Sequence, residues 1–366
     1  MELTDVTLRE GDQRPGRSYA VADRVEAGIA LDELGISYIQ AGFPATGERD
    51  SRAIRQLAAT VEAGVVGIAR AVPSDVDAAI DADVDVVEVF APLSERHLRH
   101  VVETPFEEMR RSIRAAIDRA TDRGATVHLS LLDAFRTDPD RLRAVIDAFG
   151  GVEYVNLADT VGITTPAGVT DRLDRLEGAA DFEDLSVHFH DDLGVATANV
   201  LAARASGVGK ADVSVAGIGE RAGNAALEEV AVGTDAEDGP AVGVDRRQLI
   251  PVCRRVLERL SEASPADKSV LGRDVVRHES GLHTAAMLEE PSTFEPFDPA
   301  RYGGQRELVF GEGTGRQGAR RLLERAGIEP TEDRIEAFLD VLAANGPIET
   351  DDAVELAQKR FDGAGD

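Results

Sequence analysis

The chain has 366 residues, and its 68 acidic and 40 basic side chains leave a formal charge of −28. So strong a negative charge argues against nucleic acids and anionic membranes as partners. The chain has no apolar run of transmembrane length and no basic-then-apolar leader. We therefore expect neither a membrane span nor secretion, and we predict a cytoplasmic protein. Its one cysteine, Cys253, excludes an internal disulfide and a thiolate zinc cluster.

Lysine is scarce, and arginine supplies nearly all of the positive charge. Abundant Asp and Glu beside so little Lys is typical of adaptation to a salt-rich cytoplasm, where ions screen the repulsion between acidic groups. We therefore predict a halophilic protein. An ordinary acidic cytosolic protein is the alternative.

Through the first two-thirds of the chain, short apolar runs alternate with longer amphipathic segments. The runs predict eight strands, at residues 3–8, 37–41, 65–69, 84–91, 126–130, 154–157, 185–190 and 212–215. The segments between them predict helices, among them 23–34, 105–123, 138–149, 166–176, 196–205 and 222–232. Eight strands that are each followed by a helix predict a parallel (β/α)8 TIM barrel, an α/β fold. An open doubly wound sheet is the alternative, but no GxGxxG motif follows the first strand.

The pattern predicts three parts in the chain. Residues 1–235 form the barrel, the acidic, Gly- and Pro-containing stretch 236–245 forms a linker, and residues 246–366 form a small, mostly helical C-terminal subdomain. In this subdomain we expect helices near 246–260, 315–325, 332–344 and 350–361, with a loop-rich region at 264–312. We expect no long regulatory domain beyond it.

Two histidines mark the end of the seventh predicted strand. His188 and His190 are two residues apart, so their imidazoles lie on one face of the strand, while Phe189 between them packs on the other face. Two imidazoles on one face can hold a divalent metal. By itself an HxH pair is weak evidence, because exposed or structural histidines show the same spacing.

The barrel prediction adds partners to these histidines, because catalytic groups of such barrels lie at the C-terminal ends of the strands. Polar residues from six strands then surround one mouth: Arg9, Glu10 and Gln13 after the first, Arg70 after the third, Ser130 and Asp133 after the fifth, Asp159 and Thr160 after the sixth, His188 and His190 at the seventh, and Gly217 to Asn224 after the eighth.

Within this set, Glu10, His188 and His190 make a carboxylate and two imidazoles, which suit Mg²⁺, Mn²⁺, Zn²⁺, Co²⁺ or Fe²⁺. Asn224 offers a further oxygen ligand. Open coordination positions would bind a substrate and polarise its carbonyl group, and Arg9 would stabilise the oxyanion that develops there. Two alternatives remain at this point: Glu10 and Arg9 form a structural ion pair, or Asn224 caps a helix.

Several motifs resemble the α-isopropylmalate, homocitrate and citramalate synthase family of the DRE-TIM metallolyases. In chain order they are DVTLREGDQ at 5–13, NLADTVG at 156–162, HFHDDLG at 188–194, GIGERAGN at 217–224, HESGLH at 278–283 and PSTFEP at 291–296. The resemblance covers nearly the whole chain in the family's order.

The resemblance implies a metal-dependent Claisen condensation, in which acetyl-CoA adds to the ketone of a 2-oxo acid and the thioester is then hydrolysed. By position, Glu10, His188, His190 and Asn224 resemble the metal ligands of the family. The metal would be Mg²⁺, Mn²⁺ or Zn²⁺, and acetyl-CoA would be the co-substrate.

Other roles follow from the same resemblance. Arg9 resembles the residue that polarises the 2-oxo acid, and Thr160 resembles one that binds its carboxylate. His283 matches a family histidine that does acid–base work in the barrel of the neighbouring subunit, which implies a homodimer. A structural loop histidine is the alternative for His283. We also expect Glu220 among the catalytic residues, and Gln13, Arg70 and Ser130 among those that bind substrate.

The sequence departs from the family at positions that bear on the substrate. His128 replaces an arginine with which homocitrate synthases grip a distal carboxylate, which puts a dicarboxylic substrate in doubt. Leu132 replaces an acidic residue, and Phe294 replaces a tyrosine. Our prediction is a 2-isopropylmalate synthase, with homocitrate or citramalate synthase as the alternatives.

Two further functions are weighed against these synthases. A carbon–carbon lyase of the hydroxymethylglutaryl-CoA type typically uses a cysteine in a mobile loop near the mouth, whereas Cys253 falls in a predicted helix. A non-catalytic metal-binding descendant is supported only by Leu132 and Phe294, and the retained ligand set opposes it.

Overall fold

The computed structural model describes residues 1–236 and 242–361, which divide into two compact units. Unit 1 comprises residues 1–245 and 251–264, and unit 2 comprises residues 246–250 and 265–366. No helix among the described residues is both long enough and apolar enough to cross a membrane.

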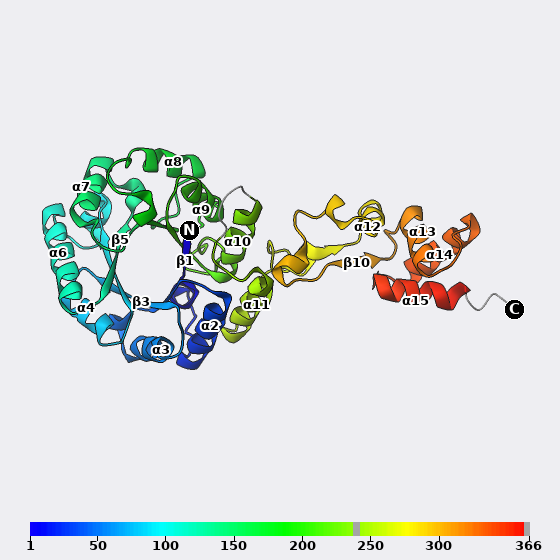
Figure 1. The fold of residues 1–366 in the computed structure, drawn as a ribbon, viewed down its shortest axis with the longest axis horizontal. Coiled ribbons are helices and arrows are strands. Elements are labelled where there is room, and N and C mark those ends of the chain that lie inside the picture. Colours follow the sequence, from blue (N-terminus) through cyan, green and yellow to red (C-terminus); the bar gives the residue numbers. More distant parts are fainter. Residues whose placement is uncertain (237–241, 362–366) are drawn as a thin grey trace. The chain divides into compact units, whose positions relative to one another are not determined.

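Unit 1 contains a closed barrel of eight parallel strands, which confirms the predicted TIM barrel and excludes the open sheet. Figure 1 shows the strands inside a ring of helices. The strands are β1 (Glu2–Asp5), β2 (Tyr38–Gly42), β3 (Gly64–Arg70), β4 (Val86–Pro92), β5 (Thr126–Leu132), β6 (Tyr154–Asp159), β7 (Leu185–Phe189) and β8 (Lys210–Val213). Closure joins β8 to β1 in parallel register, with Glu2 opposite Lys210 and Asp5 opposite Val213.

The strands are apolar because helices cover the barrel from outside. β4 reads VVEVFAP and pairs with β5 over seven residues, from Val86 opposite Thr126 to Pro92 opposite Leu132. Strands of a parallel sheet are buried on both faces and so read as nearly continuous apolar runs. The polar residues inside these runs, such as Glu88, point into the barrel.

The helices of unit 1 follow the strands and complete the alternation. They are α1 (Thr7–Glu10), α2 (Val21–Leu34), α3 (Glu48–Ala58), α4 (Pro73–Ile80), α5 (Glu95–His100), α6 (Phe106–Asp122), α7 (Pro139–Phe149), α8 (Pro166–Asp174), α9 (Ala196–Ala205), α10 (Leu227–Ala236) and α11 (Leu249–Arg259).

The first predicted strand, 3–8, is too long. β1 ends at Asp5, because the Asp5 carboxylate accepts hydrogen bonds from the backbone N–H and the hydroxyl of Thr7, both at 2.9 Å. These bonds turn the chain into α1, so Arg9 and Glu10 lie on a single helical turn after the strand.

The predicted helix 222–232 begins later than expected, at Leu227. Residues before it are held in bridges that continue the barrel, His190 with Asn224 and Ser214 with Ala226. Asn224 is therefore not the cap of α10, and its side chain is available to the mouth of the barrel.

The boundary between the units also differs from the predicted division at residue 246. Most of α11 belongs to unit 1: Val252 and Val256 on its apolar face are buried, and Arg255 pairs with Glu33 of α2. The predicted linker 236–245 includes residues 237–241, which lie outside the described part. After them, Val244 is buried, so this end of the linker packs on the barrel.

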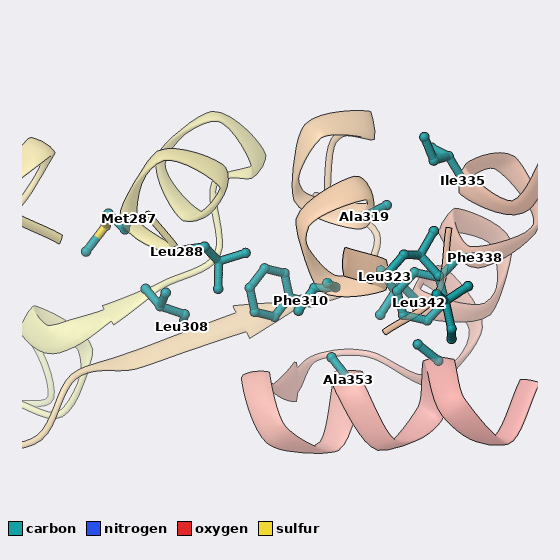
Figure 2. Close-up of a cluster of buried hydrophobic side chains, with 13 residues drawn as sticks. Met287, Leu288, Leu308, Phe310, Ala319, Leu323, Ile335, Phe338, Leu342 and Ala353 are labelled. Atoms are coloured by element: carbon teal, nitrogen blue, oxygen red, sulfur yellow. The ribbon is translucent and has the colours of Figure 1, made fainter. Parts of the chain in front are cut away.

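The described part of unit 2 contains a small sheet and four α-helices. The sheet has the order β11 (Ile348–Glu349), β10 (Glu307–Phe310) and β9 (Arg277–His278), and the helices are α12 (Gly281–Met287), α13 (Arg316–Arg325), α14 (Glu332–Asn345) and α15 (Thr350–Phe361). Figure 2 shows the apolar cluster that joins them, in which Phe310 of β10 lies among side chains of α13, α14 and α15. Unit 2 thus has a core of its own, mostly helical as predicted.

A buried polar layer fills the barrel interior toward the start of the strands. The Lys210 ammonium donates to the Thr4 hydroxyl at 2.9 Å and lies 3.5 Å from Nδ1 of His128. The His128 ring makes edge contacts with Tyr38 and Tyr154, with centroids 5.2 and 5.3 Å away. Burial, together with the positive charge of Lys210, lowers the pKa of His128 to about 2.

A neutral His128 makes the free energy of unfolding depend on pH. The unfolded chain takes up a proton on this residue near pH 6.5, whereas burial and Lys210 lower the pKa of the folded residue to about 2, although its Nε2 lies 2.8 Å from the Glu153 carboxylate. This contribution to stability is therefore complete above pH 6.5 and is lost as the pH falls, by about 1.4 kcal/mol per pH unit. We expect His128→Gln, which does not titrate, to show a shallower loss of stability between pH 6 and pH 4 in urea unfolding. Equal slopes for the two proteins would contradict a neutral His128.

Candidate metal centre and substrate cavity

Three predicted ligands converge at the mouth of the barrel. Glu10 of α1, His188 of β7 and His190 just after β7 are all buried, and one ligand atom from each lies within 4.8 Å of the others. The two Nε2 atoms are 3.4 Å apart, and Nε2 of His188 is 3.8 Å from the Glu10 carboxylate. A carboxylate and two imidazoles aimed at one point form a donor set for a divalent cation.

Asn224 completes this group. Its amide nitrogen lies 3.3 Å from Nε2 of His188, and among the described residues its buried Oδ1 has no hydrogen-bond partner. Gly219 makes room for it, since a Cβ at that position would lie 2.1 Å from this oxygen. A buried oxygen with no donor beside three converging ligands fits a bound cation. The residues present are therefore suited to the metal that the sequence predicts.

Asp212 of β8 orients the first of the two histidines. Its Oδ2 lies 3.0 Å from Nδ1 of His188 and also accepts a bond from the Asn156 amide at 3.0 Å. Burial alone would raise the pKa of Asp212, but Lys210 and His188 lower it by more than burial raises it. The net result is a pKa of about 2. An ionised Asp212 holds the ring proton of His188 on Nδ1, which leaves the Nε2 lone pair facing Glu10 and His190.

The electrostatics of the other ligands favour the forms that bind a cation. Burial raises the pKa of Glu10, but Arg9 and the two histidines lower it to a net value below its usual range. Burial also lowers the pKa of His190, to about 4, with a further contribution from His188. At neutral pH, Glu10 is therefore ionised and His190 is neutral, as ligation requires.

Arg9 is held in place by a chain of polar contacts across the barrel. Its guanidinium pairs with the Glu10 carboxylate, and its Nε donates to Oε1 of Gln40 at 2.5 Å. The Gln40 amide in turn donates to Glu88 at 3.0 Å. Arg9 is thus an oriented cation beside the ligands, and the predicted Arg9–Glu10 ion pair forms within the site itself.

A cavity of about 200 Å³ opens above these groups. Its wall has an apolar part and a polar part. The apolar part consists of Phe43, Ile68, Phe90, Leu132 and Ala158. The polar part consists of Arg9, Glu10, Gln13, Glu88, Ser130, Thr160, His188, His190 and Glu220. Such a volume suits a small molecule with one apolar and one polar end.

Most of the predicted site residues line this cavity, namely Arg9, Glu10, Gln13, Ser130, Thr160, His188, His190 and Glu220. The Thr160 hydroxyl accepts a bond from the backbone N–H of Asp133 at 2.8 Å, so its own proton is directed elsewhere. The backbone N–H of Glu220 lies 3.5 Å from the Glu10 carboxylate. The roles given to these residues stay predictions.

Arg70 ends β3 outside the cavity wall. Its guanidinium donates to the Asp75 carboxylate at 2.6 and 3.1 Å, and it lies over the ring of Phe43, 5.8 Å from the centroid. It is thus bound to an acid and is not one of the lining residues of the cavity. A substrate contact by Arg70 stays a prediction.

His283 belongs to unit 2, on α12. Its ring stacks on Phe294, with centroids 3.9 Å apart and planes 26° from parallel. Phe294, the residue that replaces a tyrosine of the family, thus contacts the predicted acid–base histidine directly. The role of His283 stays a prediction.

The other two departures from the family differ in position. Leu132 lines the cavity and gives it an apolar surface where the family has an acid. His128 lies among the buried tyrosines of the barrel interior and is not one of the lining residues. It therefore has no direct contact with a molecule in the cavity, and the inference from His128 to the substrate loses its physical basis.

Four supporting residues were missed by the sequence analysis: Gln40, Glu88, Asn156 and Asp212. Each is a polar residue in a mostly apolar strand. The residue two positions away, on the same strand face, either lines the cavity or belongs to the buried polar layer of the barrel interior. The alternation of the four residues with apolar neighbours marks them as facing the barrel interior, but which side chain each one contacts depends on the register of the strands.

Comparisons with known proteins place the chain in a family. A family model described as HMGL-like matches residues 1–256, and one described as homocitrate synthase post-HMGL domain-like matches residues 270–346. The homocitrate synthase AksA of Methanopyrus kandleri is 40% identical over 345 residues, covering 93% of this chain and 87% of that protein. The 2-isopropylmalate synthase of Sulfurisphaera tokodaii is 35% identical over 367 residues, covering 98% of this chain and 95% of that protein.

Among solved structures, the HMG-CoA lyase of Bacillus subtilis has the same barrel. It matches with a TM-score of 0.64 and 21% sequence identity, over 72% of this chain and 95% of that one. At this identity the likeness shows the fold alone.

Proposed function

This chain belongs to the HMGL-like family that includes homocitrate, 2-isopropylmalate and citramalate synthases, and on that premise we propose that it condenses acetyl-CoA with a 2-oxo acid. Within that class we propose a 2-isopropylmalate synthase. The acetyl methyl carbon would lose a proton and form a bond to the keto carbon. The keto oxygen would take up a proton and become a hydroxyl group, and water would then cleave the thioester and release CoA.

Glu10, His188, His190 and Asn224 would hold the divalent cation that this reaction uses. When bound there, the cation would draw electron density from the keto group of the 2-oxo acid. Two observations support this proposal. Ligand atoms of Glu10, His188 and His190 lie within 4.8 Å of one another, and among the described residues Oδ1 of Asn224 has no hydrogen-bond partner.

The remaining groups would bind and orient the substrate. Arg9, held by Gln40, would face the keto oxygen and stabilise the negative charge that grows on it. The Thr160 hydroxyl, whose oxygen is already engaged by Asp133, would donate its proton to the carboxylate of the 2-oxo acid. Gln13, Ser130 and Glu220 would complete the polar wall.

The proton of the acetyl methyl group needs a positioned base, and we propose His283 for this step. Such a role fits the homodimer that the resemblance implies. Both stay predictions.

The apolar wall supports the choice of substrate. Phe43, Ile68, Phe90 and Leu132 present hydrocarbon to the cavity, and Arg9 is the single arginine or lysine among the described lining residues. One cation suffices for the polar end of a 2-oxo acid, but none remains for a second, distal carboxylate. The cavity therefore favours 2-oxoisovalerate over 2-oxoglutarate, because an unpaired buried charge is costly. Homocitrate synthase is kept as the second candidate because AksA is 40% identical.

The lyase alternative is weakened by the position of the one cysteine. Cys253 is fully buried in α11, and burial raises the pKa of its thiol. It is not in a loop at the barrel mouth.

A substrate panel tests the proposal. Purified protein is incubated with acetyl-CoA, a divalent cation and one 2-oxo acid at a time in high salt, and free CoA is measured. We expect the fastest release with 2-oxoisovalerate, whose branched apolar side chain fits the wall. Faster release with 2-oxoglutarate would identify a homocitrate synthase, and with pyruvate a citramalate synthase. No release with any 2-oxo acid, and no difference between the protein and Glu10→Ala, would contradict the synthase proposal.

A further inference from the structure

A positively charged hollow lies beside the cavity, on a chain whose net charge is −28. We call it the α5 patch. It encloses about 470 Å³ and is lined by Ser94, Glu95, Arg96, Arg99, His100 and Arg136. Its charged lining residues are three arginines and one glutamate, and because Arg136 is paired with Asp133, the excess of positive charge comes from Arg96 and Arg99.

The two arginines of α5 have no partner in the part of the chain that the structure describes. Among the described residues, Arg96, Arg99 and His100 are exposed and make no hydrogen bond, ion pair or ring contact. Other exposed arginines are paired, such as Arg119 of α6 and Arg123 just after it, which both bind Asp77 at 2.8 and 2.9 Å. The α5 patch differs in having two arginines on one hollow that are unpaired within the described residues. Acids outnumber bases 68 to 40 in this chain, so partners are abundant. Unpaired arginines gathered at one place are therefore available to an external anion.

The α5 patch adjoins the mouth of the barrel. α5 follows β4, whose Phe90 lines the substrate cavity. On the other side, Arg136 is held by Asp133 at 2.7 and 2.8 Å, and the backbone N–H of Asp133 donates to Thr160 of the cavity wall. Fixed contacts thus lead from the reaction site to the patch within unit 1.

We propose that the α5 patch binds the phosphate groups of the CoA nucleotide, with Arg96 and Arg99 as the principal contacts. The inference rests on the proposed use of acetyl-CoA. A long pantetheine arm separates the reacting thioester from the phosphates, so they must bind outside the 200 Å³ cavity. Guanidinium groups form paired hydrogen bonds with phosphate oxygens. A polyanion is otherwise repelled by so acidic a protein, and a local cationic patch offsets this repulsion.

The double variant Arg96→Gln/Arg99→Gln tests the proposal by steady-state kinetics. We expect the KM for acetyl-CoA to rise by about tenfold, equivalent to ~1.4 kcal/mol of lost binding. The KM for the 2-oxo acid is expected to change little. With acetyl-pantetheine, which lacks the nucleotide, the variant and the unaltered protein are expected to show the same kcat/KM. Arg52→Gln is the matched control, because Arg52 is an exposed arginine of α3 without a partner among the described residues.

Two kinetic outcomes would overturn the proposal. One is an unchanged KM for acetyl-CoA in the double variant. The other is an equal loss with acetyl-pantetheine, since that would show a general disturbance of the barrel mouth.

Calorimetric titration with CoA alone separates this proposal from the proposed reaction. If no 2-oxo acid reacts, tight binding of CoA by the unaltered protein and weaker binding by the double variant still support the patch. Absence of CoA binding by the unaltered protein overturns it. Displacement of CoA by an equal concentration of inorganic phosphate would show a general anion site and would also overturn the assignment to CoA.

Discussion

Glu10→Gln is expected to abolish cation binding and condensation. Glutamine keeps the size of the side chain but removes the charge that faces the two imidazoles within 4.8 Å. Loss of an outer partner of a metal ligand already costs ~10–100-fold in affinity, so loss of the carboxylate itself should exceed about 100-fold. Equilibrium dialysis with Mn²⁺ measures the affinity, and CoA release measures the reaction.

A matched control for this variant is Glu107→Gln. Glu107 is an exposed residue of α6 that pairs with Arg110, so the substitution removes one carboxylate without touching the cavity. Far-ultraviolet circular dichroism shows whether each variant folds. A folded Glu10→Gln protein that binds Mn²⁺ as tightly as the unaltered chain would show that Glu10 is not a metal ligand.

Asp212→Asn is expected to weaken cation binding by about 10–100-fold, although Asp212 does not itself face the cation site. The ionised carboxylate accepts the bond from Nδ1 of His188 at 3.0 Å and lies 3.8 Å from the Lys210 ammonium. An amide at this position no longer holds the ring proton on Nδ1 by charge, so Nε2 of His188 loses part of its basicity. Dialysis with Mn²⁺ and kcat for condensation are the two measurements.

The control for Asp212 is Asp32→Asn. Asp32 accepts bonds from the backbone of Glu62 and Ala63 near the end of α2, remote from the ligands. Comparison of the two variants separates a loss of His188 orientation from the general effect of neutralising one acid. If Asp212→Asn lowers the unfolding temperature but leaves Mn²⁺ affinity intact, Asp212 serves stability and not the orientation of His188.

The ligand triad was predictable because it depends on two local rules. Side chains two apart on a strand share a face, which places His188 and His190 together. The ends of parallel barrel strands open on one side, which adds Glu10 from a segment 178 residues earlier in the chain. The structure brings the three to one point, and the HMGL-like family model matches the part of the chain that contains them.

The support around the triad was not predictable in the same way. Asp212 reaches His188 from the neighbouring strand, Gln40 of β2 accepts a bond from Arg9, and Glu88 of β4 accepts one from Gln40. These contacts depend on the register and closure of the barrel. The position of His128 also depends on register and closure. The resemblance to the family suggested that this residue lies beside the substrate, but in the barrel it is buried among tyrosines.

The extent of unit 1 shows a further limit. A break in the alternation of strands and helices suggested an end near residue 235, yet most of α11 belongs to the barrel unit, where Arg255 pairs with Glu33 of α2. Ion pairs between surfaces of distant helices leave no periodic signal in the chain.

By itself, the sequence determined the order of strands and helices, the barrel class and the three residues that converge as candidate ligands, because these follow from periodicity along the chain and from the common side on which barrel strands end. Only the tertiary structure decided which polar residues orient those ligands, which side chains form the apolar wall, and where unpaired arginines gather beside the mouth. Those features depend on distances between residues far apart in the sequence, and barrel closure sets these distances.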